Sequence, residues 1–309
     1  MNLEVSNQIN LYGHEKQFTE LINLYLNNKL PNKILLSGEK GVGKCTLAYH
    51  LINFILSTDE LYSYDLENFQ INPENRSFKL IQNKSNPNFI LVDVIEEKKK
   101  IDINQIRNLI LTLNKSSFNS KPRFILIDNI ELLNINSINA LLKILEEPND
   151  KINFLLINNN KKILPTLKSR CLNFKIPLTH DQSIEITNKL IKSNFNNILN
   201  KELTTNYSTP GQILNIINFA NINDIDSKNI NLKQFISEII IGKKYKKETL
   251  IKDLLYSLIE IYFINNTSMI NIKFLDLHNY FLKKIHETKT FNLDEETLFM
   301  EFNERVLNG

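Results

Sequence analysis

Apolar and polar residues follow one another along the first 180 positions in short blocks that predict strands and helices in turn. Between the predicted strands, apolar residues recur at helical spacing, as at Leu47, Leu51 and Ile55. Strands that alternate with helices form mostly parallel sheets and bind ligands at the carboxyl ends of the strands, so this part predicts an α/β domain. The five runs predicted as strands are 34–36, 89–94, 124–128, 154–157 and 172–176.

The strand pattern stops after Pro177, and the apolar positions beyond it follow helical spacing only. We therefore predict an α/β domain over residues 1–177, a small helical domain over 178–227 and a helical bundle over 228–309. The polar segment 58–88 has few periodic apolar positions and predicts an insertion or an irregular connection.

A glycine-rich segment lies between the first predicted strand and a predicted helix. Its spacing is that of a phosphate-binding loop, in which backbone N–H groups face a phosphate and a lysine adds positive charge. One position departs from the motif, because a cysteine stands where Ser or Thr normally holds Mg²⁺. If the segment binds a ligand, we expect the phosphates of ATP or ADP. We do not expect it to bind Mg²⁺ well. It comprises Gly38, Glu39, Lys40, Gly41, Val42, Gly43, Lys44, Cys45 and Thr46.

Composition narrows the class of protein. A chain of 309 residues that is 42% hydrophobic is long and apolar enough for two or three folded domains. The net charge of +3 is too small to argue for nucleic-acid binding, and two cysteines exclude a disulfide framework. Neither signal-peptide features nor an apolar run of roughly 18 residues is visible, so we expect a cytoplasmic location.

Four segments, taken in order, resemble the AAA+ clamp-loader subunits of bacterial DNA polymerase III, and among them the delta-prime group. They are Leu11 to Glu15 with the glycine loop, Ile103 to Arg107, Asn139 to Pro148, and Ser169 to Cys171. The resemblance implies an AAA+ P-loop domain followed by a helical lid and an all-α collar domain. It also implies partners: the gamma/tau and delta subunits in a hetero-oligomeric ring, with the sliding clamp and primed DNA met through the complex, and no membrane.

The same resemblance implies roles for single residues. Arg170, flanked by Ser169 and Cys171, matches an arginine finger that acts in trans on the ATP site of a neighbouring subunit. Asp128 matches a degenerate Walker B acid, because active ATPases of this class have Asp-Glu where this chain has Asp128 and Asn129. An amide cannot accept a proton from the attacking water as a carboxylate does.

Two further positions bear on ATP hydrolysis. Glu131 is near Asn129 in sequence, but we expect it past the strand end and at another angle. Gln212 stands where active members present an arginine to the γ-phosphate. Together with Cys45 and Asn129, Gln212 predicts a largely non-hydrolysing stator within the DNA polymerase III holoenzyme, a nucleotidyltransferase complex.

Two alternatives remain open at this stage. An active P-loop ATPase would need Thr46 or Glu131 to replace the missing groups, and whether the chain is an enzyme by itself is left open. A direct DNA-binding module is disfavoured by the mild charge and the lack of a basic aromatic stripe. A zinc module of the kind that some relatives carry is excluded over 58–88, which has no cysteine.

Several charged residues have plainer interpretations. Glu146 and Glu147 are not expected to form a catalytic pair, because adjacent helix positions point about 100° apart, and we interpret them as helix-end or interface charges. A lysine cluster is expected to be a solvated loop, with a DNA-facing patch as the alternative. It comprises Lys243, Lys244, Lys246 and Lys247.

Overall fold

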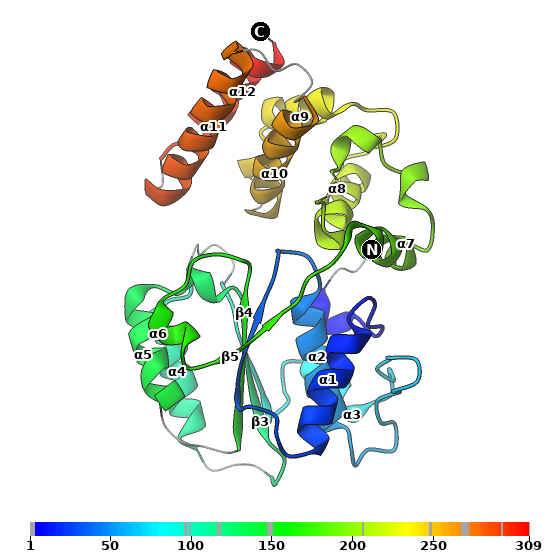
Figure 1. The fold of residues 1–309 in the computed structure, drawn as a ribbon, viewed down its shortest axis with the longest axis vertical. Helices are drawn as coiled ribbons and strands as arrows, with labels where there is room; N and C mark the ends of the chain where they lie inside the picture. Colours follow the sequence, from blue (N-terminus) through cyan, green and yellow to red (C-terminus); the bar gives the residue numbers. More distant parts are fainter. Residues whose placement is uncertain are drawn as a thin grey trace. The chain divides into compact units, whose positions relative to one another are not determined.

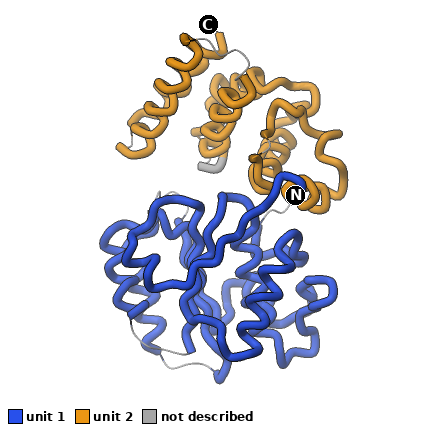
Figure 2. The backbone as a smooth tube through the Cα atoms, viewed as in Figure 1, with its two compact units in different colours: residues 1–182 blue, residues 183–309 orange. Residues whose placement is uncertain are grey.

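The computed structural model describes residues 4–95, 98, 100–115, 119–146, 151–205, 207–246, 249–266, 272–291 and 293–308. The chain forms two compact units, Met1–Gln182 and Ser183–Gly309 (Figure 2). Side chains from both sides of the predicted boundary at 227 share one hydrophobic core in the second unit. Separate lid and collar domains therefore stay a prediction. Within the described residues, none of the helices combines the length and apolar character that a membrane crossing needs.

The first unit is built on a five-stranded sheet in which every neighbouring pair is parallel, in the order β2-β3-β4-β1-β5. This confirms the predicted α/β class. One expectation was wrong: the run at 89–94 was predicted to be a buried strand, but β2 lies at the sheet edge and Leu91 is 43% exposed. The strands are β1 (Lys33–Ser37), β2 (Phe89–Val92), β3 (Arg123–Ile127), β4 (Ile152–Asn158) and β5 (Leu172–Lys175).

Helices cover both faces of this sheet (Figure 1). On β1, Ile34 and Leu36 pack into the core beneath α1, α2 and α3, while Leu35 packs into the core beneath α4, α5 and α6. This alternation is expected for a central strand, because successive side chains point to opposite faces. The helices are α1 (Glu15–Leu26), α2 (Lys44–Leu56), α3 (Arg76–Gln82), α4 (Ile103–Leu113), α5 (Ile135–Glu146) and α6 (Pro165–Lys168).

The segment 58–88 braces the back of α2 instead of forming a wholly irregular connection. Asn75 caps α3 by accepting a hydrogen bond from the backbone N–H of Phe78, and it also accepts one from Asn53 of α2. Buried His50 of α2 lies 2.8 Å from the Tyr64 hydroxyl, and burial lowers the pKa of His50 to about 4. The short α3 was missed because its seven residues hold few periodic apolar positions.

The second unit is entirely helical in its described part, as the pattern predicts. Its core contains Phe235, Phe263, Phe281 and Phe302, each fully buried or nearly so. The helices are α7 (His180–Ile191, which contains the boundary between the units), α8 (Pro210–Ile222), α9 (Leu232–Ile241), α10 (Thr249–Asn265), α11 (Ile272–Phe291) and α12 (Glu295–Phe302), with a π-helical turn at Asn303–Leu307. Short 3₁₀ turns in the chain lie at Val5–Asn7, Ile130–Leu132, Phe195–Asn197, Lys201–Leu203 and Lys244–Lys246.

The lysine cluster after α9 is tied to its own unit. Lys243 and Lys246 both pair with Glu296 of α12, at 2.8 and 2.5 Å. The ammonium group of Lys244 lies 5.6 Å from the centre of the Phe219 ring. Lys247 lies outside the described residues. Three of the four lysines therefore have contacts within their own unit, and no nucleic acid is needed to explain their positions.

Candidate functional site

The glycine loop joins β1 to the N-terminus of α2, and its geometry explains why glycines are needed. Gly41 and Gly43 have φ angles of +88° and +98°, in the left-handed region that favours glycine. A Cβ atom on Gly38 would lie 2.5 Å from the carbonyl oxygen of Ile176, closer than real Cβ contacts come. Three glycines are therefore required by backbone conformation or by close approach, as in a phosphate-binding loop.

His14 forms a hydrogen bond with the backbone of this loop. Its Nε2 lies 2.5 Å from the carbonyl oxygen of Val42 and donates a hydrogen bond to it. Burial lowers the pKa of His14, so the ring is neutral and Nδ1 is an acceptor, which has no partner among the described residues. Sequence reasoning included His14 only within a family segment, because nothing in the spacing links two residues 28 positions apart.

Lys44 folds back onto its own loop. Its side chain is 3% exposed, and Nζ donates to the carbonyl oxygens of Gly38 at 2.9 Å and Glu39 at 2.6 Å. Burial lowers the pKa of Lys44 to about 8, although the carboxylates of Asp128 and Glu131 act in the opposite direction. A phosphate that binds here would replace two carbonyl partners of an ammonium already held in place.

The remaining loop residues differ in their surroundings. Glu39 and Lys40 are exposed, and Glu39 accepts a 2.6 Å hydrogen bond from Asn160, which follows β4. Val42 is buried in the core beneath α1 and α2, and Thr46 is half-buried. The structure thus closes the loop against the carboxyl end of β4.

Asp128 lies beside the loop at the end of β3. Its carboxylate accepts hydrogen bonds from the backbone N–H of Asn129, at 2.8 Å, and from the thiol of Cys45. Burial and the charge of Asp93 raise the pKa of Asp128 to about 6, and burial with the Asp128 charge raises the pKa of Cys45. Mg²⁺ prefers hard oxygen ligands, and a protonated thiol is a poor one, so this pair does not fit the metal. The described residues include no cluster of three or more His, Cys, Asp or Glu side chains arranged for a metal ion.

Asn129 is fixed by hydrogen bonds from both sides. Its Nδ2 donates to Asp93 at 2.9 Å, and its Oδ1 accepts from Asn159 at 2.8 Å. Asn159 also donates to the Glu131 carboxylate at 2.9 Å, which brings Glu131 into the network. Sequence reasoning missed Asp93 and Asn159 as site residues, although in the structure each directly follows the carboxyl end of a strand, β2 and β4 respectively.

Arg170 makes its contacts elsewhere in the first unit. Its side chain is 33% exposed; one terminal nitrogen donates to the carbonyl oxygen of Thr166 at 2.8 Å, and the other pairs with the carboxylate of Glu146. Ser169 donates to the same Thr166 carbonyl, at 3.1 Å. Cys171 is half-buried, and burial raises its pKa to about 11, so its thiol stays protonated. Glu147, the neighbour of Glu146, lies outside the described residues.

Gln212 takes part in a capping box at the start of α8. Its side chain accepts from the backbone N–H of Thr209 at 2.9 Å, while the Thr209 hydroxyl accepts from the backbone N–H of Gln212 at 3.4 Å. This arrangement satisfies N–H groups at the helix N-terminus. The Thr-x-x-Gln spacing is the signal that could have revealed it from sequence.

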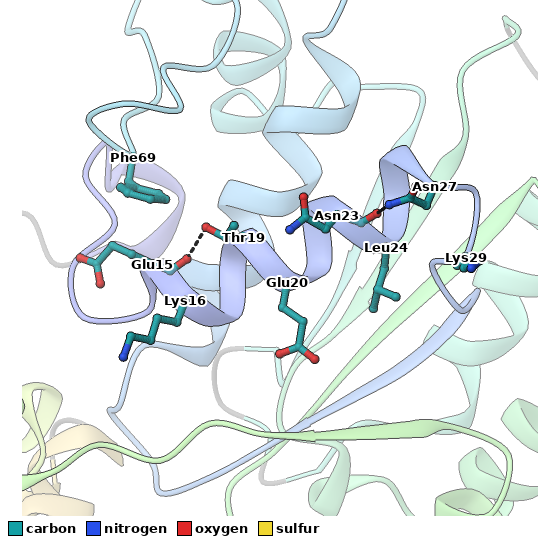
Figure 3. Close-up of a pocket in the computed structure, with 9 residues that line it drawn as sticks. All are labelled: Glu15, Lys16, Thr19, Glu20, Asn23, Leu24, Asn27, Lys29 and Phe69. Carbon is teal, nitrogen blue, oxygen red and sulfur yellow. Dashed lines mark hydrogen bonds between the residues drawn. The ribbon is translucent and has the colours of Figure 1, made fainter.

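An open hollow of about 750 Å³ lies on the outer face of α1 (Figure 3). Two of its polar side chains are occupied within the helix: Thr19 donates to the carbonyl oxygen of Glu15, and Asn27 to that of Asn23. No residue of the glycine loop lines it, and its contacts suggest no particular ligand. It is lined by Glu15, Lys16, Thr19, Glu20, Asn23, Leu24, Asn27, Lys29 and Phe69.

Comparisons with known proteins show the family to which this chain belongs. Residues 13–180 match the family model described as "DNA polymerase III, delta subunit". The chain is 28% identical over 286 residues to DNA polymerase III subunit delta′ of Buchnera aphidicola subsp. Schizaphis graminum, covering 87% of this chain and 83% of that protein. It is 30% identical to subunit delta′ of Pseudomonas aeruginosa, over 47% of this chain and 42% of that one.

A solved structure supports the fold. A DNA polymerase III gamma-subunit-related protein from Thermotoga maritima superposes with a TM-score of 0.52 at 18% identity, over 92% of this chain and 97% of that one. The family model covers more than half of the chain, including the glycine loop and Arg170. The chain therefore belongs to the DNA polymerase III delta-subunit family and is similar to proteins named DNA polymerase III subunit delta′.

Proposed function

We propose that the chain acts as a delta-prime-like subunit of the DNA polymerase III clamp loader and is itself largely non-hydrolysing. Its partners would be the gamma/tau and delta subunits in a hetero-oligomeric ring that loads the sliding clamp onto primed DNA during replication. Similarity to proteins named delta′ and gamma subunits supports this assignment. In this role the chain is a stator against which the ATPase subunits work.

The hydrogen-bonded state of Asn129 carries the proposal. Its amide takes the position of the water-activating carboxylate, and Asp93 and Asn159 hold it at 2.9 and 2.8 Å. A side chain so engaged, with no basic oxygen, does not take a proton from water. The thiol of Cys45 on Asp128 weakens the metal position further.

The glycine loop retains the means to hold phosphates. ATP or ADP would be held by the backbone of residues 38–46, with Lys44 as the positive charge and the N-terminus of α2 adding its dipole. A bound nucleotide would place its negative charge beside Lys44. Because Lys44 already has two carbonyl partners, the loop keeps its shape without that charge.

Arg170 would then be catalytic in trans. A guanidinium that neutralises charge developing on a γ-phosphate is worth on the order of 10³–10⁵ in rate. Arg170 projects just before β5 and is partly exposed, as a group that reaches a neighbouring subunit must be.

The test is ATP hydrolysis by the purified chain alone. We expect no turnover above that of a Lys44→Ala variant purified in the same way, which reports contaminating ATPases. Brisk hydrolysis that Lys44→Ala abolishes would contradict the proposal.

An active P-loop ATPase is the second candidate, and Glu131 is the observation in its favour. Asn159 holds the Glu131 carboxylate, whose charge acts on Lys44. If Glu131 were the water-activating base, Glu131→Gln would abolish hydrolysis by the isolated chain. Under the stator proposal, the same substitution leaves the low background unchanged.

A further inference from the structure

Arg170 is held by two anchors that come from different elements. Thr166 belongs to α6 and offers a backbone carbonyl, whereas Glu146 belongs to α5 and offers a carboxylate. A guanidinium has five N–H donors in a rigid plane, and these two anchors engage one on each terminal nitrogen. Three donors, including Nε–H, remain without a partner among the described residues.

Both anchors stand on backbone that the same core immobilises. Leu145, next to Glu146, and Leu167, three residues before Arg170, are each 1% exposed in the core beneath α4, α5 and α6. Figure 1 shows α5 and α6 side by side on this face of the sheet. The ion pair therefore joins two fixed points and restricts the guanidinium to a small region.

Glu146 has no evident role in stabilising its own helix. The described part of α5 extends to Glu146, and toward the C-terminal end of a helix the dipole disfavours a carboxylate. Its side chain is 56% exposed, and exposed ion pairs add little to stability. A residue that breaks a local preference without a gain in stability points to a functional reason.

We propose that Glu146 is the positioning residue of the arginine finger, an inference that rests on the proposed trans role of Arg170. An unrestrained arginine loses much side-chain freedom when it engages a phosphate, and a pre-positioned one has already lost part of it. Glu146 and Thr166 engage one donor on each terminal nitrogen of the guanidinium, which leaves the other donors for γ-phosphate oxygens of the adjacent subunit. The carboxylate acts through its reach and its acceptor oxygen, more than through its charge.

Three substitutions at Glu146 separate these properties. Glu146→Ala removes the acceptor, Glu146→Asp keeps the charge but shortens the reach, and Glu146→Gln keeps the reach and an acceptor oxygen without the charge. A matched control is Glu185→Ala, which removes an exposed carboxylate paired with Lys189 in the second unit. Each variant is assembled with the gamma/tau and delta subunits, and steady-state ATP turnover is measured with clamp and primed DNA.

We expect Glu146→Ala and Glu146→Asp to lower kcat about threefold to tenfold, the effect of losing one pre-ordered side chain. KM for ATP and assembly of the complex should not change, because neither depends on where the guanidinium rests. Glu146→Gln and Glu185→Ala should stay within about twofold of the parent. In an Arg170→Ala background, Glu146→Ala should have no further effect, since the group that it positions is gone.

Different results would contradict the trans role of Arg170 and the positioning role of Glu146. If Arg170→Ala lowers kcat but Glu146→Ala and Glu146→Asp leave it unchanged or raise it, the positioning role is wrong and the finger stands. A fall in kcat that persists for Glu146→Ala in the Arg170→Ala background also overturns the positioning role. If Arg170→Ala leaves kcat unchanged, the trans finger itself is wrong, and the role of Glu146 falls with it.

Discussion

Replacing Asp128 by asparagine should stabilise the chain, and the gain should grow as the pH rises. In the folded chain the pKa of Asp128 is about 6, against an ordinary value of 3.8, because the carboxyl is buried and faces Asp93. The unfolded chain releases this proton near pH 4, whereas the folded chain keeps it until about pH 6. The stability lost by burying the charged Asp128 carboxylate is therefore zero below pH 3.8, grows between pH 3.8 and 6, and reaches its full size above pH 6.

The size of the effect follows from the shift. A rise of about two pH units at about 1.4 kcal/mol per unit amounts to about 3 kcal/mol of lost stability at neutral pH. Asparagine keeps a carbonyl oxygen that accepts from the Asn129 backbone and the Cys45 thiol, but it carries no charge to bury. Asp128→Asn should thus recover a large part of this free energy at pH 7.5 and little near pH 4.

Urea unfolding of the full chain between pH 4.5 and 7.5 measures this difference. Circular dichroism is the signal, because the chain has no tryptophan, and the transition of the first unit is followed. Asp59→Asn is a matched control, since Asp59 is exposed in the same unit and its substitution should change stability by less than about 0.5 kcal/mol at each pH. A gain from Asp128→Asn that is equal at all pH values, or that shrinks as the pH rises, would refute the reasoning.

Three further predictions follow from single contacts. Gly38→Ala places a Cβ 2.5 Å from the Ile176 carbonyl oxygen and should destabilise the first unit by about 1–3 kcal/mol in urea unfolding; an unchanged midpoint would mean that the loop relaxes freely. Thr209→Ala removes the cap of α8 and should cost about 1 kcal/mol, with Thr209→Ser close to the parent in thermal melts; equal losses in both variants would count against the cap. Asn129→Asp replaces the amide donor facing Asp93 with a carboxylate and should lower the free energy of unfolding by about 1–3 kcal/mol at neutral pH; an unchanged free energy of unfolding would count against the importance of this contact.

Local patterns in the sequence were sufficient to predict much of the first unit. The apolar runs predicted the parallel strands, and the helical spacing of Leu47, Leu51 and Ile55 predicted the helix that the structure shows as α2. The glycine loop was recognised because its residues are contiguous, and the structure shows the strand before it and the helix after it. In each case the residues on which the prediction rests lie close together in the sequence.

The features that sequence reasoning missed join residues far apart in the chain. The bond from His14 to Val42, the bridge from Asn159 to Asn129, and the pair of Arg170 with Glu146 span 28, 30 and 24 positions. No periodicity links such residues, since the fold alone brings them together. The edge position of β2 was missed for the same reason, because an apolar run does not reveal whether a strand has one neighbour or two.

The most direct test of the account is the steady-state ATPase of the assembled clamp loader, with the parent chain and with Arg170→Ala. The account predicts that the complex still assembles, and that clamp- and DNA-stimulated turnover falls by a large factor while the isolated chain stays nearly inactive. Unchanged turnover in an intact complex carrying Arg170→Ala would contradict the claim that this chain supplies an arginine finger to its neighbour.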